Sequence, residues 1–413
     1  MPISWKKAKR FNPDTILKRI AETRTINDKG GVSFSGFELQ QHIGVLYSML
    51  SFPDACEQFD KTRLIWSGLS NARPEISKDS FLHAINDALT ASLSKRSEKY
   101  ILVTSISTPS LTRKAEVKVL THTVKFYPNG LPRKFRSHKE ILEKNKRIEE
   151  SIDEPKSYTP ISIEVTAKSD MEAANKALYE IDLLRGLWCL FANPYMQVSM
   201  FTNGRGPINV IRLGNCHTLH KPNGASATDA CWFEYDYTKA NPYKIKNDSQ
   251  HPRNTRIILG RLAKAHYKTS LSDSIVACAR ALDEPDPSSA FLRLWTALES
   301  LVTPNQADYD LVVKRCSFLF ADHEYQKQIL EHLREYRNSV VHTTKEQIEA
   351  RTNCYYLQIF FRALIWFLIN NGTRFKSLSE ANEFLDFPND AESINRRIQL
   401  LQKARKFVAT DET

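Results

Sequence analysis

Residues 289–301 have the sequence Ser-Ala-Phe-Leu-Arg-Leu-Trp-Thr-Ala-Leu-Glu-Ser-Leu, with apolar side chains three and four positions apart. This spacing places Phe291, Trp295 and Leu298 on one face, which is typical of a helix that packs into a core. Directly before it, Asp286-Pro287-Ser288 offers a capping side chain and then a proline at the first helical position. The stretch therefore predicts a buried helix with a defined start.

The chain has helical character on both sides of this stretch, from about residue 256 almost to its end. Further amphipathic segments occur at Ser272–Leu282, Tyr309–Phe320, Tyr325–Arg337 and Ala391–Phe407. A capping-box pattern at Thr344 and Gln347 predicts one more helix, which ends at the Asn371-Gly372 stop. Residues 256–413 are therefore expected to form an all-α domain.

The first 255 residues mix helical and strand-like patterns. Helices are predicted at 37–50, 80–93 and 171–192. β-Branched and aromatic residues predict strands at 100–106, 115–127, 161–167, 208–213 and 231–237. A hairpin turn is expected at Asn223-Gly224, and the polar stretch 241–255 is the predicted linker. The sequence thus predicts an α+β protein with a mixed α/β domain at 1–255, for sensing or substrate positioning, before the all-α domain at 256–413.

Composition narrows the class of protein. A hydrophobic fraction of 41% in 413 residues excludes a wholly disordered chain. The longest apolar run, 357–369, is interrupted by Arg362, so a buried helix is expected and no membrane span. The N-terminus lacks the apolar stretch of a secretory signal, and seven scattered cysteines without a CxxC pair predict no disulfide framework. A cytoplasmic protein is expected. The net charge of +11 is compatible with a polyanionic partner.

The segment Leu333-Arg-Glu-Tyr-Arg-Asn-Ser-Val-Val-His342 contains the side chains best suited to chemistry. Cleavage of RNA without a metal needs a group that takes the 2′-hydroxyl proton and one that protonates the leaving 5′-oxygen. It also needs a fixed cation beside the developing phosphorane. Histidine carries protons near pH 7, and arginine matches phosphate oxygens with a bidentate fork. Arg337, Asn338 and His342 together suffice for such a reaction.

Helical geometry restricts how these residues can cooperate. A five-residue step along one helix rotates about 500°, which leaves Arg337 and His342 about 140° apart. Either the helix ends between them, or two copies of the chain combine their residues across a twofold-symmetric cleft. A third interpretation involves no chemistry: Arg337 pairs with a nearby carboxylate and His342 caps a helix end.

Two stretches resemble the HEPN superfamily (higher eukaryotes and prokaryotes nucleotide-binding), and specifically its ApeA-like branch. Residues 289–301 are similar to the opening helix of the family, which ends in Ala-Leu-Glu-x-Leu, and residues 333–342 are similar to its Arg-Asn-x3-His signature. The resemblance covers about residues 257–410. Upstream, 172–187 resembles a helix of the N-terminal regions that are attached to such domains.

The resemblance implies a metal-independent endoribonuclease of antiphage defence or a toxin system. By position, Arg337 would bind the scissile phosphate, His342 would handle the proton, and Asn338 would orient the phosphate or brace the motif. Glu299 matches an acidic residue on the earlier helix of many relatives. It would orient Arg337 or His342, although an ordinary ion pair is an equal alternative.

The resemblance also sets the expected partners. They are RNA, a second copy bound through the helical domain, and a phage-derived trigger or an antitoxin; no cofactor and no metal are expected. Some HEPN proteins only bind nucleotides or partner proteins, so a non-catalytic binding module remains the alternative function.

Other patterns carry less information. Cys216-His217-x2-His220 with Cys231 invites a zinc interpretation, but neighbouring strand residues face opposite sides and the spacing fits no standard site. Ordinary strand residues are expected there. Gly204-Arg-Gly206 lacks the pattern of a phosphate-binding loop. Basic clusters are compatible with RNA backbone binding or with plain solvated faces; they lie at 6–10, 133–136, 144–147 and 396–406.

Overall fold

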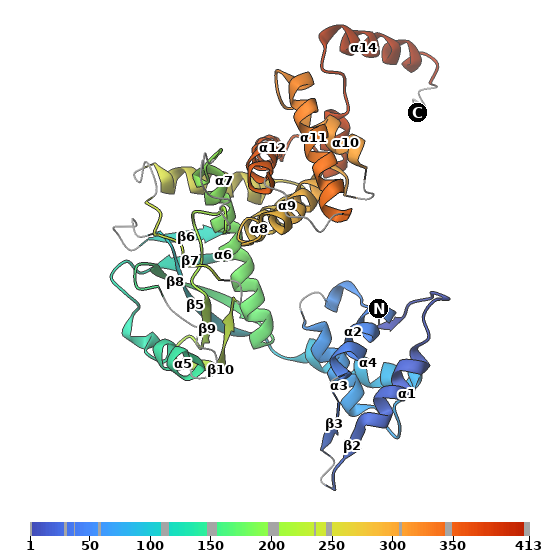
Figure 1. The fold of residues 1–413 in the computed structure, drawn as a ribbon, viewed down its shortest axis with the longest axis vertical. Coiled ribbons are helices and arrows are strands. Elements are labelled where there is room, and N and C mark those ends of the chain that lie inside the picture. Colours follow the sequence, from blue (N-terminus) through green and yellow to red (C-terminus); the bar gives the residue numbers. More distant parts are fainter. Residues whose placement is uncertain are drawn as a thin grey trace, which may run out of the picture. The chain divides into compact units, whose positions relative to one another are not determined.

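The computed structural model describes residues 2–28, 31–36, 38–56, 59–108, 115–146, 155–196, 206–234, 237–244, 250–304, 308–342 and 349–408, and of His342 it describes the backbone alone. The chain divides into two compact units (Figure 1). The first holds Met1–Leu102, Val165–Ala177 and Leu219–Asn223, and the second holds Val103–Glu164, Leu178–Thr218 and Gly224–Thr413. The domain boundary predicted at 255/256 falls inside α7 (His251–Lys264), within the second unit.

The first unit is built mainly from four helices around one apolar core. They are α1 (Pro13–Thr23), α2 (Leu39–Met49), α3 (Lys61–Asn71) and α4 (Lys78–Ser94), and Ile20, Leu46, Ile65 and Phe81 are among their buried residues. Two short antiparallel pairs accompany them, β1 (Ser4–Trp5) with β4 (Leu50–Ser51) and β2 (Arg24–Ile26) with β3 (Val32–Phe34). A single 3-10 turn, η1, covers Asp54–Cys56. The helices predicted at 37–50 and 80–93 correspond to α2 and α4.

A six-stranded sheet has the order β10-β9-β5-β8-β7-β6. Its strands are β5 (Glu98–Ile106), β6 (Glu116–Val119), β7 (His122–Phe126), β8 (Thr159–Ala167), β9 (Cys216–His220) and β10 (Ser226–Phe233). β5 is buried without interruption from Tyr100 to Ile106, as its interior place in the sheet requires. Gly224, at φ +90°, occupies the predicted turn between β9 and β10. Between β7 and β8 lie η2 (Arg133–Phe135) and α5 (Ser137–Lys146).

Three predictions about the front half are corrected by the structure. The single strand expected at 115–127 is a hairpin, because Leu120 takes a positive φ of 44° and reverses the chain between β6 and β7. The strand expected at 208–213 forms only one bridge, Leu213 with Ile106. The amides of Ile208 and Asn209 bond instead to the Leu282 carbonyl. The linker expected at 241–255 is helical from His251 onward.

The rest of the described chain is helical. After α6 (Asp170–Ala192) and α7, it forms α8 (Lys268–Ala281), α9 (Pro287–Val302), α10 (Tyr309–Ser317), α11 (His323–His342), α12 (Ala350–Asn370), α13 (Leu378–Leu385) and α14 (Ala391–Arg405). α9 is the central helix, since it packs against α8, α10, α11 and α12 (Figure 1). Its predicted start is confirmed: the Asp286 side chain accepts a 2.7 Å hydrogen bond from the Ser289 amide. Thr344 and Gln347 lie outside the described residues.

α12 is the one helix among the described residues that is long and apolar enough to cross a membrane. In its most apolar 18-residue window 61% of the residues are buried, as is typical of a core helix in a soluble protein. The buried helix expected around 357–369 is therefore confirmed, and the predicted stop is confirmed by Asn371 at the C-cap. Fourteen helices and a six-stranded sheet in the described chain make the protein α+β, as predicted.

Candidate functional site

Arg337 and His342 lie in the same unbroken helix. α11 runs from His323 to His342, so the alternative in which a helix ends between the two residues does not hold. The side chain of His342 lies outside what the structure describes. Because the two positions differ by about 140° around the helix axis, they lie on different faces of α11. Of the two catalytic arrangements, the one that combines two copies remains.

The Arg337 guanidinium is held by an aromatic ring. Its central carbon lies 4.7 Å from the ring centroid of Tyr309, within the range of a cation–π contact. Its Nη1 donates a long hydrogen bond of 3.5 Å to Oδ1 of Asn338. Among the described residues no carboxylate forms a salt bridge with it, whereas Arg334, three positions earlier, pairs with Asp310 at 2.6 Å. Arg337 is therefore a positioned, half-buried cation, and the structural alternative of a carboxylate pair has no partner in the described chain.

Glu299 lies on α9 and faces the same region. Its Oε1 is buried and has no hydrogen-bond partner among the described residues. Burial raises the pKa of this carboxyl group, and the positive charge of Arg337 counteracts part of that rise. The two side chains are thus within electrostatic reach without forming a direct ion pair. The structure therefore places Arg337 near Asn338 and Glu299.

Tyr309 completes this cluster and was not among the predicted site residues. It is the first residue of α10, and its ring lies 6.3 Å from that of Trp295, one turn before Glu299 on α9. Nothing in the local sequence marks it, because its role depends on how α10 packs against α9 and α11. We call Arg337, Asn338, Glu299 and Tyr309 the Arg337 cluster. It offers a phosphate a guanidinium that forms no direct salt bridge with a carboxylate of the described chain.

The residues considered for zinc have other partners. Nδ1 of His217 lies 2.7 Å from the Thr104 hydroxyl, and its Nε2 lies 3.5 Å from Glu234. Cys216 and His220 are buried on β9, and Cys231 lies on β10. Among the described residues no group of three or more His, Cys, Asp or Glu side chains is placed to hold a metal ion.

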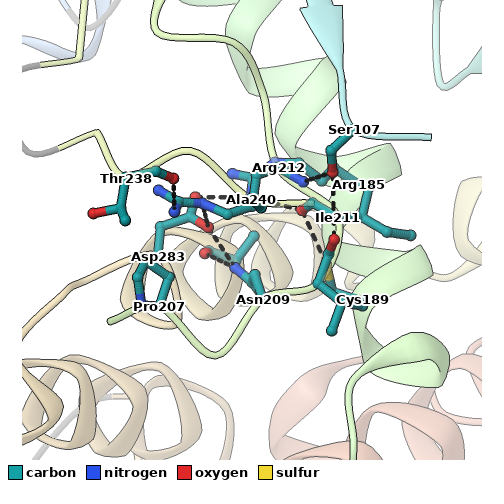
Figure 2. Close-up of polar contacts among 12 residues, drawn as sticks. Ser107, Arg185, Cys189, Pro207, Asn209, Ile211, Arg212, Thr238, Ala240 and Asp283 are labelled. Carbon is teal, nitrogen blue, oxygen red and sulfur yellow. Dashed lines mark hydrogen bonds and ion pairs between the residues drawn. The ribbon is translucent and has the colours of Figure 1, made fainter. Parts of the chain in front are cut away.

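A second polar cluster, which the sequence analysis missed, is buried between α6 and the end of α8 (Figure 2). Arg185 is 2% exposed and bridges two carboxylates, Asp182 at 2.6 Å and Asp283 at 2.7 Å. Arg212 lies beside Asp283, and Asn209 donates to Asp283 at 2.8 Å. The signal was an Asp and an Arg three positions apart in an otherwise apolar part of the helix predicted at 171–192.

No family model matches this chain, and searches of curated proteins and of solved structures found no match.

Proposed function

We propose that the protein is a metal-independent endoribonuclease of the HEPN type, which cleaves RNA by attack of a 2′-hydroxyl on the adjacent phosphate. The observation that supports this most is the Arg337 guanidinium, fixed over Tyr309 and not ion-paired within the described chain. A phosphorane gathers negative charge as it forms, and a cation that is already in place stabilises it without reorganisation. An arginine engaged in a strong salt bridge would first have to leave its partner.

Each motif residue has a role in this proposal. Arg337 binds the scissile phosphate, Asn338 orients it, and His342 transfers the proton. Glu299 acts through Arg337 and is a positioning residue. Because Arg337 and His342 occupy different faces of one helix, the site combines two copies of the helical domain. For this domain we propose a HEPN bundle over residues 256–413. The essential partners are then RNA and a second copy of the chain. The protein acts in the cytoplasm, and a phage-derived trigger or an antitoxin controls its activity.

The reaction class is tested with purified protein and end-labelled single-stranded RNA in excess EDTA. Single strands are the expected substrate because attack by the 2′-hydroxyl needs an in-line geometry that stacked duplexes restrict. We expect fragments that end in 2′,3′-cyclic phosphate, and no cleavage where a 2′-deoxynucleotide replaces the nucleotide at the cut. Activity that disappears on chelation contradicts a metal-free mechanism.

The site is tested by the Arg337→Ala and His342→Ala variants. Each is expected to lower the cleavage rate by about 10²-fold or more, the scale of losing one charge-stabilising or proton-transferring group. Arg334→Ala is the matched control on the same helix, because Arg334 is paired with Asp310. Far-UV circular dichroism and melting curves should be alike for all three variants. Wild-type cleavage by both site variants would leave the motif without a catalytic role.

A non-catalytic RNA-binding module is the second candidate, and the separation of Arg337 from His342 along α11 favours it in a chain that does not self-associate. Such a chain would hold phosphates through Arg337 but would lack a proton carrier beside them. A gel-shift and a cleavage assay on the same RNA separate the two functions. Retention of RNA without products supports the binding module.

A further inference from the structure

A polar cavity of about 330 Å³ opens beside the second polar cluster. α6, residues 212–214, the end of β10 and the connection between α8 and α9 line it, and all of these residues belong to the second unit. None of the Arg337 cluster contributes to its walls. Its volume is in the range of small-molecule sites in proteins.

The walls of this cavity are densely charged, with four arginines and four carboxylates among the lining residues. Asp182 accepts from Arg185 and from Arg280, each at 2.6 Å. Asp283 accepts from Arg185 at 2.7 Å, and Arg212 lies 3.5 Å from it. Three guanidinium groups therefore share these two carboxylates, and Glu234, whose pKa Arg280 and Arg185 help to lower, adds a third carboxylate to the cavity wall. At the rim, Arg293 and Glu284 pair with each other at 2.6 Å and add no net charge.

Arg212 is the poorly satisfied member of the three. Its side chain is 7% exposed, and its Nε is buried without a hydrogen-bond acceptor among the described residues. The nearest carboxylate oxygen, Oδ1 of Asp283, already accepts a 2.8 Å hydrogen bond from Asn209 (Figure 2). Nη1 of Arg212 donates a hydrogen bond to the Thr238 carbonyl, which fixes the orientation of the guanidinium group. A buried guanidinium N–H without an acceptor is costly, and an anionic ligand in the cavity would satisfy it.

Another lining residue, Glu234, suits a different part of a ligand. Glu234, at the end of β10, stays ionised because the neighbouring His217, whose Nε2 lies 3.5 Å from its Oε1, lowers its pKa to about 2. Its carboxylate repels an anionic group and accepts from hydroxyl or amino donors. The ring of Tyr237 lies 5.4 Å from the Arg212 guanidinium carbon, and both Tyr237 and Phe233 line the cavity.

We propose that this cavity binds a small organic phosphate of about the size of a nucleoside monophosphate. Its phosphate accepts from Nε of Arg212 and from the half-exposed Arg280, and its hydroxyl or amino groups donate to Glu234. Phosphate fits better than carboxylate because its several oxygens can satisfy two arginine forks at once. The chemistry is shared by sugar phosphates and nucleotides, so both are tested. The proposal does not depend on the ribonuclease function.

The test is isothermal titration calorimetry on the full chain with four probes: ribose 5-phosphate, adenosine 5′-monophosphate, adenosine and inorganic phosphate. We expect at least one organic phosphate to bind with a Kd below about 100 µM. Adenosine, which lacks the phosphate, and inorganic phosphate, which lacks the hydroxyl donors, should each bind at least about tenfold more weakly than that probe. Comparable binding of inorganic phosphate, or binding of neither organic phosphate, overturns the proposal.

Substitutions in the cavity wall test whether the organic phosphate binds there. Arg212→Gln should weaken the organic phosphate at least about tenfold. Because Arg212 is buried, Arg280→Gln, whose side chain is 48% exposed, gives a second measurement if the first variant does not fold. Arg396→Gln on α14, a helix without buried residues, is the matched control and should bind as the wild type does. Arg337→Ala should also bind normally. Unchanged affinity in Arg280→Gln or in a folded Arg212→Gln places the ligand elsewhere and overturns the assignment.

Discussion

Glu299 shows how one residue can oppose stability while it serves a site. A carboxylate with a buried, unpartnered oxygen is less stable in the folded protein than in water, and burial accordingly raises its pKa. A raised folded-state pKa means that the full stability is present below the unfolded pKa of about 4.3 and is lost as the pH rises through the folded value. Glu299 should therefore favour the folded state less at neutral pH than below about pH 4.

The Glu299→Gln variant should be more stable than the wild type at pH 7, by about 1–3 °C in Tm, because the amide carries no charge to desolvate. The difference should disappear below about pH 4, where the wild-type carboxyl is protonated in both states. Cleavage of RNA should fall, since Arg337 loses the charge that orients it. Melting curves at both pH values and an RNA cleavage assay check this. A less stable variant at pH 7 would mean that Glu299 has a stabilising partner.

The sequence named candidate residues but not their surroundings. Arg337, Asn338 and Glu299 could be named as candidates in advance because a resemblance assigned them by position. Tyr309 and Asp283 could not be named, and the spacing of Asp182 and Arg185 did not show their partner. Their importance arises from contacts between segments far apart in the chain, and local patterns do not encode which segments meet.

Among the elements, helices were predicted more reliably than strands, for a physical reason. α9 carries its start, its apolar face and its cap within 17 consecutive residues, Asp286 and the 16 of the helix. Residues 208–213 have strand-like composition, but whether they form a strand depends on which partners their amides find. Two of those amides find the Leu282 carbonyl. β propensity describes a fit to a half-buried surface and does not ensure that a neighbouring strand is there.

The packing of α6 on α8 depends on one glycine. A Cβ built on Gly186 would lie 2.9 Å from Cγ2 and 3.0 Å from the carbonyl oxygen of Ile275. The carbonyl belongs to the backbone, so it cannot move aside by a change of rotamer. Gly186→Val should therefore destabilise the protein by about 1–3 kcal/mol through overpacking. Gly260→Ala, on α7, is the matched control: no atom lies within 4 Å of its added Cβ, and alanine favours a helix by about 1 kcal/mol over glycine. Urea unfolding of both variants checks the opposite signs, and equal effects would contradict close α6–α8 packing.

At the scale of the whole molecule, the continuous α11 has the largest consequence. Because Arg337 and His342 occupy positions about 140° apart on this helix, the proposed ribonuclease activity should depend on self-association. The proposed assembly is a twofold dimer in which each composite site takes its arginine from one chain and its histidine from the other. Activity per chain should then fall on dilution below the dissociation constant.

Heterodimers of differently tagged chains test this arrangement. When Arg337→Ala and His342→Ala chains are co-purified, one of the two composite sites keeps both residues, so roughly half of the wild-type activity should return. In the converse heterodimer, a wild-type chain pairs with a chain that carries both substitutions, and neither composite site is complete. It should therefore be nearly inactive. A site contained within one chain predicts the reverse, an inactive first heterodimer and a half-active second one. Failure of the tagged chains to co-purify would contradict the dimer itself.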